Sequence, residues 1–184
     1  MMHIEKYLEH LDLIFEQEPE FYSNESLIEG IPGVSSILYR NYPDVGYITA
    51  LTYGLSLADH PEWKMGRPEL CITVESANID WGIVVGFIAN SLRGKSPFCY
   101  GETINFGEKV SDDSEMDAFL IYAPSILDKT EYLNIDIGAE YKINIAGLHP
   151  IYSDEIKVYN EIGLKDFWLH PNFEIFTLNR EKVF

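Results

Sequence analysis

Residues 69–92 have the sequence ELCITVESANIDWGIVVGFIANSL, which changes from a strand pattern to a helix pattern. Apolar side chains alternate with more polar ones over residues 69–75, which predicts a strand with one face in the core. From Trp81 to Leu92 the apolar residues recur at helical spacing, and either Asn78 or Asp80 can cap the first turn. This stretch predicts a strand followed by a helix that packs on the sheet.

Further elements are expected on both sides of this stretch. Apolar patterns typical of strands occur at residues 34–39, 48–57, 103–106, 118–123, 132–137, 141–148 and 173–178. Helices are predicted over residues 3–17, from Ser153 to Gly163, and over residues 164–168. Because helices are too few to alternate with the strands, we expect a single α+β domain over residues 1–184, with a mixed, largely antiparallel sheet packed by helices.

The charge of the chain restricts its partners. The 184 residues include 13 Lys and Arg against 30 Asp and Glu, a formal charge of −17, and 46% of them are hydrophobic. Such a surface repels phosphate backbones and anionic lipids but favours fast encounter with a basic protein. The longest apolar run, Trp81 to Ala89, is much shorter than the roughly 20 residues of a membrane span. With no secretory signal pattern at Met1, the sequence predicts a cytoplasmic protein that binds neither nucleic acid nor membrane.

Tests for catalytic patterns fail one after another. Residues 54–58, GLSLA, lack the closing glycine and the following helix of a nucleophile elbow. Glu102 stands where a zinc deaminase needs its second cysteine, and no two histidines have the helical spacing of a zinc site. Phosphate-binding glycine loops are absent as well. We therefore expect no enzyme activity, no cofactor and no metal, with Cys71 and Cys99 as buried apolar residues.

An acidic stretch at residues 112–117, DDSEMD, holds four carboxylates. Its simplest interpretation is a solvated loop between strands. A calcium site is the weaker alternative, because the stretch lacks the central glycine and the distal glutamate of an EF-hand loop.

Several segments together carry a resemblance to a known family. They are Tyr53-Gly54-Leu55-Ser56, Arg67 to Val74, Phe98-Cys99-Tyr100-Gly101-Glu102, Asp113-Ser114-Glu115, and Ile143 to Glu155. In their order and spacing, over about residues 27–178, they resemble the suppressor-of-fused (SUFU) domain family. Animal members of this family clasp a short extended peptide with the help of a second, carboxyl-terminal domain that this sequence lacks. Single-domain bacterial relatives are interpreted as immunity proteins, which bind and neutralise toxins.

The resemblance implies a binding function without catalysis and points to candidate contact residues. Glu102 matches an acidic position in the ligand site of the peptide-clasping relatives, and Tyr100 adds an aromatic anchor beside it. Asn90 stands at a position where an aromatic residue helps to bind the peptide in animal members. Asp112 and Asp113 extend the acidic surface.

Three classes of function remain open at this point. The first is an immunity protein that binds a toxin, such as a basic toxin domain, and the second is an adaptor or regulatory domain that binds a protein or peptide partner. The third is an enzyme whose site has no recognisable motif. A toxin gene next to this one would favour the first class, and an endogenous partner without a toxin would favour the second.

Overall fold

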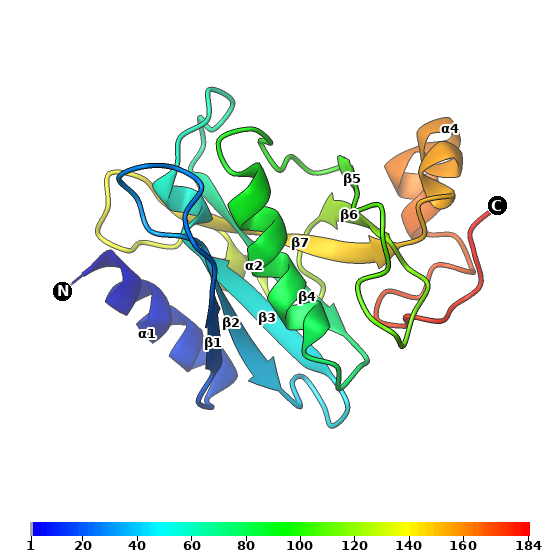
Figure 1. The fold of residues 1–184 in the computed structure, drawn as a ribbon, viewed down its shortest axis with the longest axis horizontal. Helices are drawn as coiled ribbons and strands as arrows, with labels where there is room; N and C mark the ends of the chain where they lie inside the picture. Colours follow the sequence, from blue (N-terminus) through cyan, green and yellow to red (C-terminus); the bar gives the residue numbers. More distant parts are fainter. Residues whose placement is uncertain (1) are drawn as a thin grey trace.

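A computed structural model describes residues 2–184, which form one continuous seven-stranded sheet with helices on both faces (Figure 1). The helices are α1 (His3–Phe15), α2 (Asp80–Leu92), α3 (Lys129–Tyr132) and α4 (Glu155–Trp168), with a 3-10 turn at Leu55–Leu57. The strands are β1 (Glu20–Ser23), β2 (Ser35–Arg40), β3 (Ile48–Tyr53), β4 (Arg67–Val74), β5 (Thr103–Asn105), β6 (Ala118–Tyr122) and β7 (Ile143–Ile151). The predicted α+β class is confirmed.

The sheet is mixed but mostly antiparallel, in the order β1-β2-β3-β4-β7-β6-β5. Strands β4 and β7 are parallel neighbours, in a register that pairs Glu69 with Ile145. The other neighbouring strands run antiparallel. In the sequence, the β5–β6 hairpin comes after α2 and before β7. In the sheet, β5 forms one edge.

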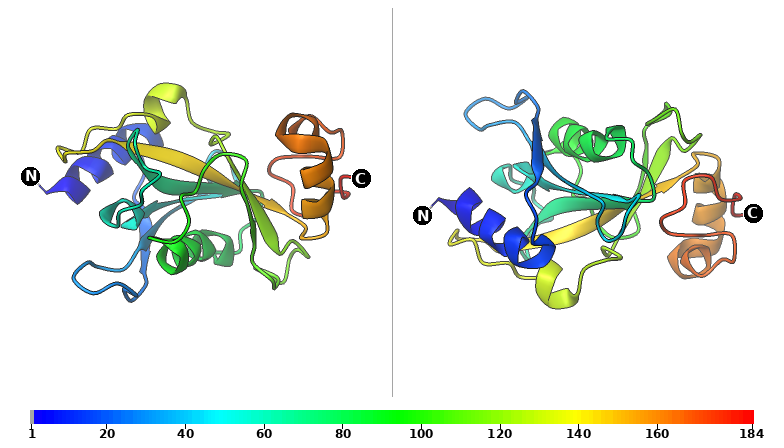
Figure 2. Two further views of the ribbon diagram at one scale, coloured as in Figure 1. Left: turned by 90° about the horizontal axis from the view of Figure 1, so that it is seen from above. Right: turned by 90° about the horizontal axis from the view of Figure 1, so that it is seen from below.

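The helices cover the two faces and one end of the sheet. Figure 2 shows α2 on one face, with α1 and α3 on the other, and α4 at the end where the chain terminates. The core between α2 and the sheet contains Trp81, Leu70 and Phe119. On the opposite face Tyr7 and Leu11 of α1 pack against Ile145 and its neighbours. A third cluster around Phe167 lies under α4.

Helix α2 sits unusually close to the sheet because two of its residues are glycines. A Cβ at Gly82 would lie 2.3 Å from Leu38 Cδ1, and a Cβ at Gly86 would lie 2.3 Å from Ser36 Oγ. The Gly86 amide instead donates a hydrogen bond of 3.0 Å to Ser36 Oγ. The N-cap residue of α2 is Ile79 and not Asn78 or Asp80, although the Asp80 amide donates to Asn78 Oδ1 at 3.0 Å just before the helix.

The buried side chain of Glu69 accepts hydrogen bonds from the residues where β3 ends and the 3-10 turn begins. Glu69, fully buried in β4, accepts hydrogen bonds from Thr52 Oγ1 at 2.6 Å, the Gly54 amide at 2.9 Å, and both the amide (3.0 Å) and the hydroxyl (2.8 Å) of Ser56. Gly54 takes φ 121°, which a residue with a side chain rarely adopts. The strand predicted over residues 48–57 therefore stops at Tyr53.

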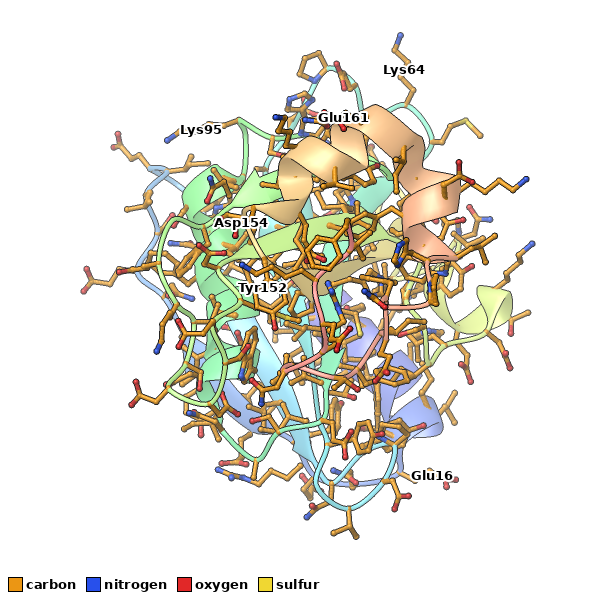
Figure 3. All side chains as sticks on the ribbon, turned by 90° about the vertical axis from the view of Figure 1, so that its right-hand side faces the viewer. Glu16, Lys64, Lys95, Tyr152, Asp154 and Glu161 are labelled. Carbon is orange, nitrogen blue, oxygen red and sulfur yellow. The ribbon has the colours of Figure 1, made fainter. Side chains whose placement is uncertain are left out.

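A buried ion pair fixes the carboxyl-terminal segment to the start of α4. Arg180 donates to both oxygens of Glu155 at 2.8 Å, and each side chain is only 1% exposed. The amides of Tyr152 and Val183 donate to the same carboxylate at 2.8 Å. Figure 3 looks onto this end of the molecule, with Tyr152 and Asp154 near the start of α4.

Two predicted strands are wrong. Residues 132–137 do not form a strand, because Asp128 and Glu131 make a capping box that starts α3, and one isolated bridge, Ile135 with Ile143, follows it. Residues 173–178 form turns, held by the packing of Phe173 under α4 and of Leu178 in the α2 core. Strand β1 was not predicted.

The helix predictions agree with the structure. The helix predicted over residues 3–17 is α1, and the two helices predicted to meet at Gly163 are the halves of α4, where Gly163 takes the non-helical values φ 83° and ψ 171°. Among residues 2–184, no helix has the length and apolar character that crossing a bilayer requires.

Trp81 gives a test of the α2 core. Its ring is fully buried and its indole N–H donates to Asp113 at 3.0 Å. Trp81→Ala should lower the free energy of unfolding by about 3 to 5 kcal/mol, because it leaves a large cavity. Urea unfolding would measure the loss, with the exposed Leu13→Ala as the control. A Trp81→Ala protein as stable as the control would contradict the burial of the Trp81 side chain between α2 and the sheet.

The ion pair of Glu155 and Arg180 gives a second test. Arg180→Leu should cost about 3 to 5 kcal/mol, because it leaves a carboxylate buried without its partner. Replacing both residues by Met should cost less than Arg180→Leu alone. Lys182→Leu is the matched control, since it breaks the exposed pair with Asp154 and should change the melting temperature little. Equal losses for Arg180→Leu and Lys182→Leu would contradict a buried pair.

Candidate functional site

The turn at residues 97–102 presents two of the predicted contact residues on the surface. Its backbone is held by hydrogen bonds from the Gly101 amide to Ile121 O at 2.8 Å and from Tyr159 Oη to Gly101 O at 2.6 Å. Phe98 has φ 52°, and its side chain, 3% exposed, is packed in the α2 core. This packing holds a backbone conformation that a bulky residue rarely adopts. These contacts therefore hold the backbone of the turn in one conformation.

Glu102 and Tyr100 lie together on this turn. One oxygen of Glu102 accepts a hydrogen bond from the Cys99 amide at 3.1 Å, and among residues 2–184 no Lys, Arg or His forms an ion pair with this carboxylate. The Tyr100 ring is 47% exposed and meets Tyr122 edge-on at 5.4 Å. Burial raises the pKa of Tyr100 to about 12, so its hydroxyl is a neutral donor at pH 7.

Cys99, expected to be buried, is exposed, whereas Cys71 is buried as predicted. Partial burial raises the pKa of the Cys99 thiol, and the carboxylates of Glu102 and Glu62 raise it further. A thiolate is the nucleophilic form of cysteine, so this environment disfavours a reactive thiol. Cys99 therefore contributes exposed surface beside the groove.

An apolar groove of about 390 Å³ lies between the 97–102 turn and the loop at residues 62–68. The Trp63 indole N–H donates to Pro97 O at 2.8 Å and so ties the loop to the turn. The lining residues include Met65, Pro68, Phe98, Tyr100, Leu133 and Ala146. The groove can take apolar side chains of a ligand whose backbone lies along the turn.

Strand β5 continues the turn along an open edge of the sheet (Figure 1). Glu102 O accepts from Ile121 N, and Phe106 N donates to Asp117 O, so the peptide groups of Thr103 and Asn105 point away from β6. In the described part of the chain no strand pairs with β5 on that side. Unpaired groups of this kind are a template for an added strand.

The other predicted contact residues are placed differently. Asn90 is 6% exposed, accepts from the Val34 amide at 3.0 Å and donates to Glu25 O at 2.9 Å, so its amide joins parts of its own chain. Asp113 accepts hydrogen bonds from Ser76, Ser111 and Trp81. Burial raises the pKa of the Asp113 carboxyl, but these bonds outweigh that effect and hold the pKa below its usual value.

Asp112 is exposed, but it lies at the far end of the β5–β6 hairpin from Glu102. The structure thus brings Tyr100 and Glu102 together, with Asp112 apart from them. Asn90 is buried and Asp113 is exposed, and both side chains make hydrogen bonds within their own chain. The groove and the β5 edge were not predicted, although the alternation of polar and apolar residues at 103–106, next to a glycine turn, marked the position of the strand.

The described residues hold no group of three or more His, Cys, Asp or Glu side chains placed to bind a metal ion. Two buried titratable side chains have structural roles: Glu69 orders the turn after β3, and His149, 4% exposed, hydrogen-bonds to Ala123 O at 3.0 Å. Burial lowers the pKa of His149 to about 4, so its imidazole is neutral at pH 7.

Comparison with solved structures identifies the fold. No protein-family model and no curated protein matches the sequence. Among solved structures, a SUFU homolog from Neisseria gonorrhoeae FA 1090 matches with a TM-score of 0.71 and 17% identity, over 98% of this chain and 96% of that one. The chain has the suppressor-of-fused fold.

Two further structures extend this likeness. The Sufu–Fu complex matches with a TM-score of 0.69 and 12% identity, over 98% of this chain and 91% of that one. Drosophila Suppressor of Fused matches with a TM-score of 0.68 and 13% identity, over 97% of this chain but 50% of its own length. The chain thus spans about half of the Drosophila protein, and the resemblance first noted in short motifs holds for the SUFU fold as a whole.

The neutral, buried His149 predicts an acid-sensitive stability. An unfolded histidine has a pKa near 6.5, so the contribution of neutral His149 is complete above about pH 6.5 and is lost as the pH falls towards 4. Between pH 7.5 and 5, the wild type should lose about 2 kcal/mol more than His149→Gln. Urea unfolding at both pH values measures this difference. The exposed His3→Gln should behave like the wild type, and an equal loss in His149→Gln would contradict the assignment.

Proposed function

We propose that this chain is a non-catalytic protein-binding domain whose partner docks on the 97–102 turn and the adjoining edge of β5. The observation that carries the proposal is the unpaired β5 edge, which begins beside an exposed aromatic ring, an unpaired carboxylate and an apolar groove. Together these features supply the backbone, charge and pocket contacts of strand-addition binding.

The contacts have separate physical roles. The outward peptide groups of Thr103 and Asn105 hydrogen-bond a partner backbone without regard to its sequence. The groove between the turn and the 62–68 loop takes a partner side chain, and its apolar lining supplies affinity. Glu102 attracts a basic residue and fixes the register of the added strand.

The net charge supports a basic partner. A formal charge of −17 attracts basic proteins over a distance of about one Debye length and raises the rate of encounter. One of the structures with the same fold is a complex of Sufu with Fu, so a protein of this fold does bind a protein partner.

The finer hypothesis is that the partner is a basic toxin domain and that this chain is its immunity protein. It is supported by the charge and by the resemblance to single-domain bacterial SUFU proteins. Co-expression with the product of the adjacent gene tests it: the chain should restore growth that the toxin stops. A partner without toxicity would make the chain an adaptor or regulatory peptide-binding domain instead.

Glu102→Lys tests the position of the interface. Reversal of a charge opposite a basic partner should weaken binding about tenfold or more, because repulsion replaces attraction at the interface. Calorimetry with the adjacent-gene product measures the affinity, and the melting temperature should equal that of the wild type.

Glu9→Lys makes the same change in net charge on α1, outside the site, and should weaken binding less than threefold. Asp112→Lys tests whether the acidic loop contributes. Equal affinities of wild type, Glu102→Lys and Glu9→Lys would place the interface elsewhere on the domain.

A further inference from the structure

A second apolar hollow lies at the other end of β5 from Glu102. It has a volume of about 290 Å³ and is bounded by one side of α2 and by residues 106–110, which follow β5 directly. Its lining includes Asp80, Phe87, Phe106 and Glu108. Neither the sequence patterns nor the 97–102 turn accounts for it.

Two aromatic rings belong to the apolar part of this hollow. Phe87 is 48% exposed, although it lies in the middle of α2, and it meets Phe106 edge-on at 6.1 Å. Phe106 in turn meets the buried Phe119 at 6.3 Å. The rings are therefore held by the core on one side and open to solvent on the other. A half-exposed phenylalanine in a preformed hollow is typical of a contact site for an apolar side chain.

Two carboxylates stand at the border of the hollow without cationic partners. Asp80 and Glu108 are exposed, and in the described part of the chain no Lys, Arg or His forms an ion pair with either. Lys109, the neighbour of Glu108, pairs with Glu115 at 2.9 Å instead. The hollow thus combines an apolar floor with uncompensated negative charge.

We propose that this hollow binds an aromatic side chain of the partner strand, with a Lys or Arg of that strand beside Asp80 and Glu108. The inference rests on the proposed function and adds the chemistry of the partner. A strand paired with Asn105 reaches Phe106 one residue further on, about 3.3 Å along the chain. One extended segment can therefore contact the turn, the β5 edge and the hollow in succession.

The negative charge of the chain favours a basic partner strand over a second copy of the chain or an anionic membrane. A second copy of the chain would bring another charge of −17 to an acidic surface, and an anionic membrane would be repelled in the same way. A basic segment is attracted by both carboxylates, and no Lys, Arg or His of residues 2–184 lines the hollow to repel it. An aromatic residue adjoining a Lys or Arg is the partner feature that the hollow fits.

A small probe tests the hollow without the partner. Phenethylammonium carries an aromatic ring and a cation, and 3-phenylpropionate carries the same ring with an anion. In amide NMR titrations of the whole chain, phenethylammonium should shift residues 83–87 and 106–110, and 3-phenylpropionate should bind at least fivefold more weakly. Equal binding of the two probes, or shifts confined to other regions, would overturn the inference.

Variants complete the test. Phe87→Ala and the Asp80→Asn, Glu108→Gln double variant should each weaken phenethylammonium binding at least fivefold, whereas Phe21→Ala, which removes an exposed ring from β1, should not. Each should also weaken the partner at least fivefold with a melting temperature near that of the wild type. If both bind probe and partner like the wild type, the inference is wrong.

The outcomes separate the inference from the proposed function. If Glu102→Lys weakens the partner and the hollow variants do not, the interface at the turn stands and the inference fails. If neither Glu102→Lys nor the hollow variants change the affinity for the partner, the inference and the proposed interface are both wrong.

Discussion

The buried carboxylate of Glu69 is the interaction on which the arrangement of the site depends. Burial raises its pKa, and the donors from Thr52, Ser56 and Gly54 offset part of that effect. The turn that these donors form is held from its other side by Arg93, which donates to Gly54 O at 2.9 Å, and by Arg67, which donates to Ser56 O at 3.1 Å. Arg93 follows α2 and Arg67 begins β4, so one buried carboxyl group and its hydrogen bonds link the segments that lead into the groove. Removing the carboxylate would leave several buried donors unpaired, which costs more than the hydrogen bonds themselves contribute.

Most of the fold could be predicted from periodicity, and the errors have local causes. The α2 stripe and the alternation in β4 and β7 were decisive because each element buries one face on a core. Strand β1 was missed because its four residues, Glu20–Ser23, are half exposed or exposed and show no apolar alternation. Residues 173–178 look like a strand because Phe173 and Leu178 are apolar, but their burial comes from packing under α4 and against the α2 core. No neighbouring strand pairs with them.

The candidate contact residues came from the family resemblance alone, and they stay predictions. Tyr100 and Glu102 are close in sequence and share one turn, so a motif could mark them. The bonds of Asn90 and Asp113 within the chain could not be read from the sequence, because their partners, Val34 and Trp81, lie far away in it, and a polar residue in a motif looks the same whether it binds a ligand or its own chain. The position of Phe87 in the sequence does indicate an exposed ring, because it lies outside the apolar stripe of α2. An aromatic residue on the solvent side of a helix is a candidate contact residue.

The acidic surface has a consequence for the open edge of the sheet. An unpaired edge strand invites pairing with another copy of the same chain, and proteins suppress this with short edges and charge. Here β5 has three residues, and copies that each carry −17 repel one another, so the edge is protected from self-association yet open to a basic strand. Exposed charges are screened at physiological salt, so they select the partner and speed its approach more than they hold it. The lasting affinity must come from contacts that exclude water, which at this edge are the apolar groove beside Tyr100 and the hollow beside Phe87.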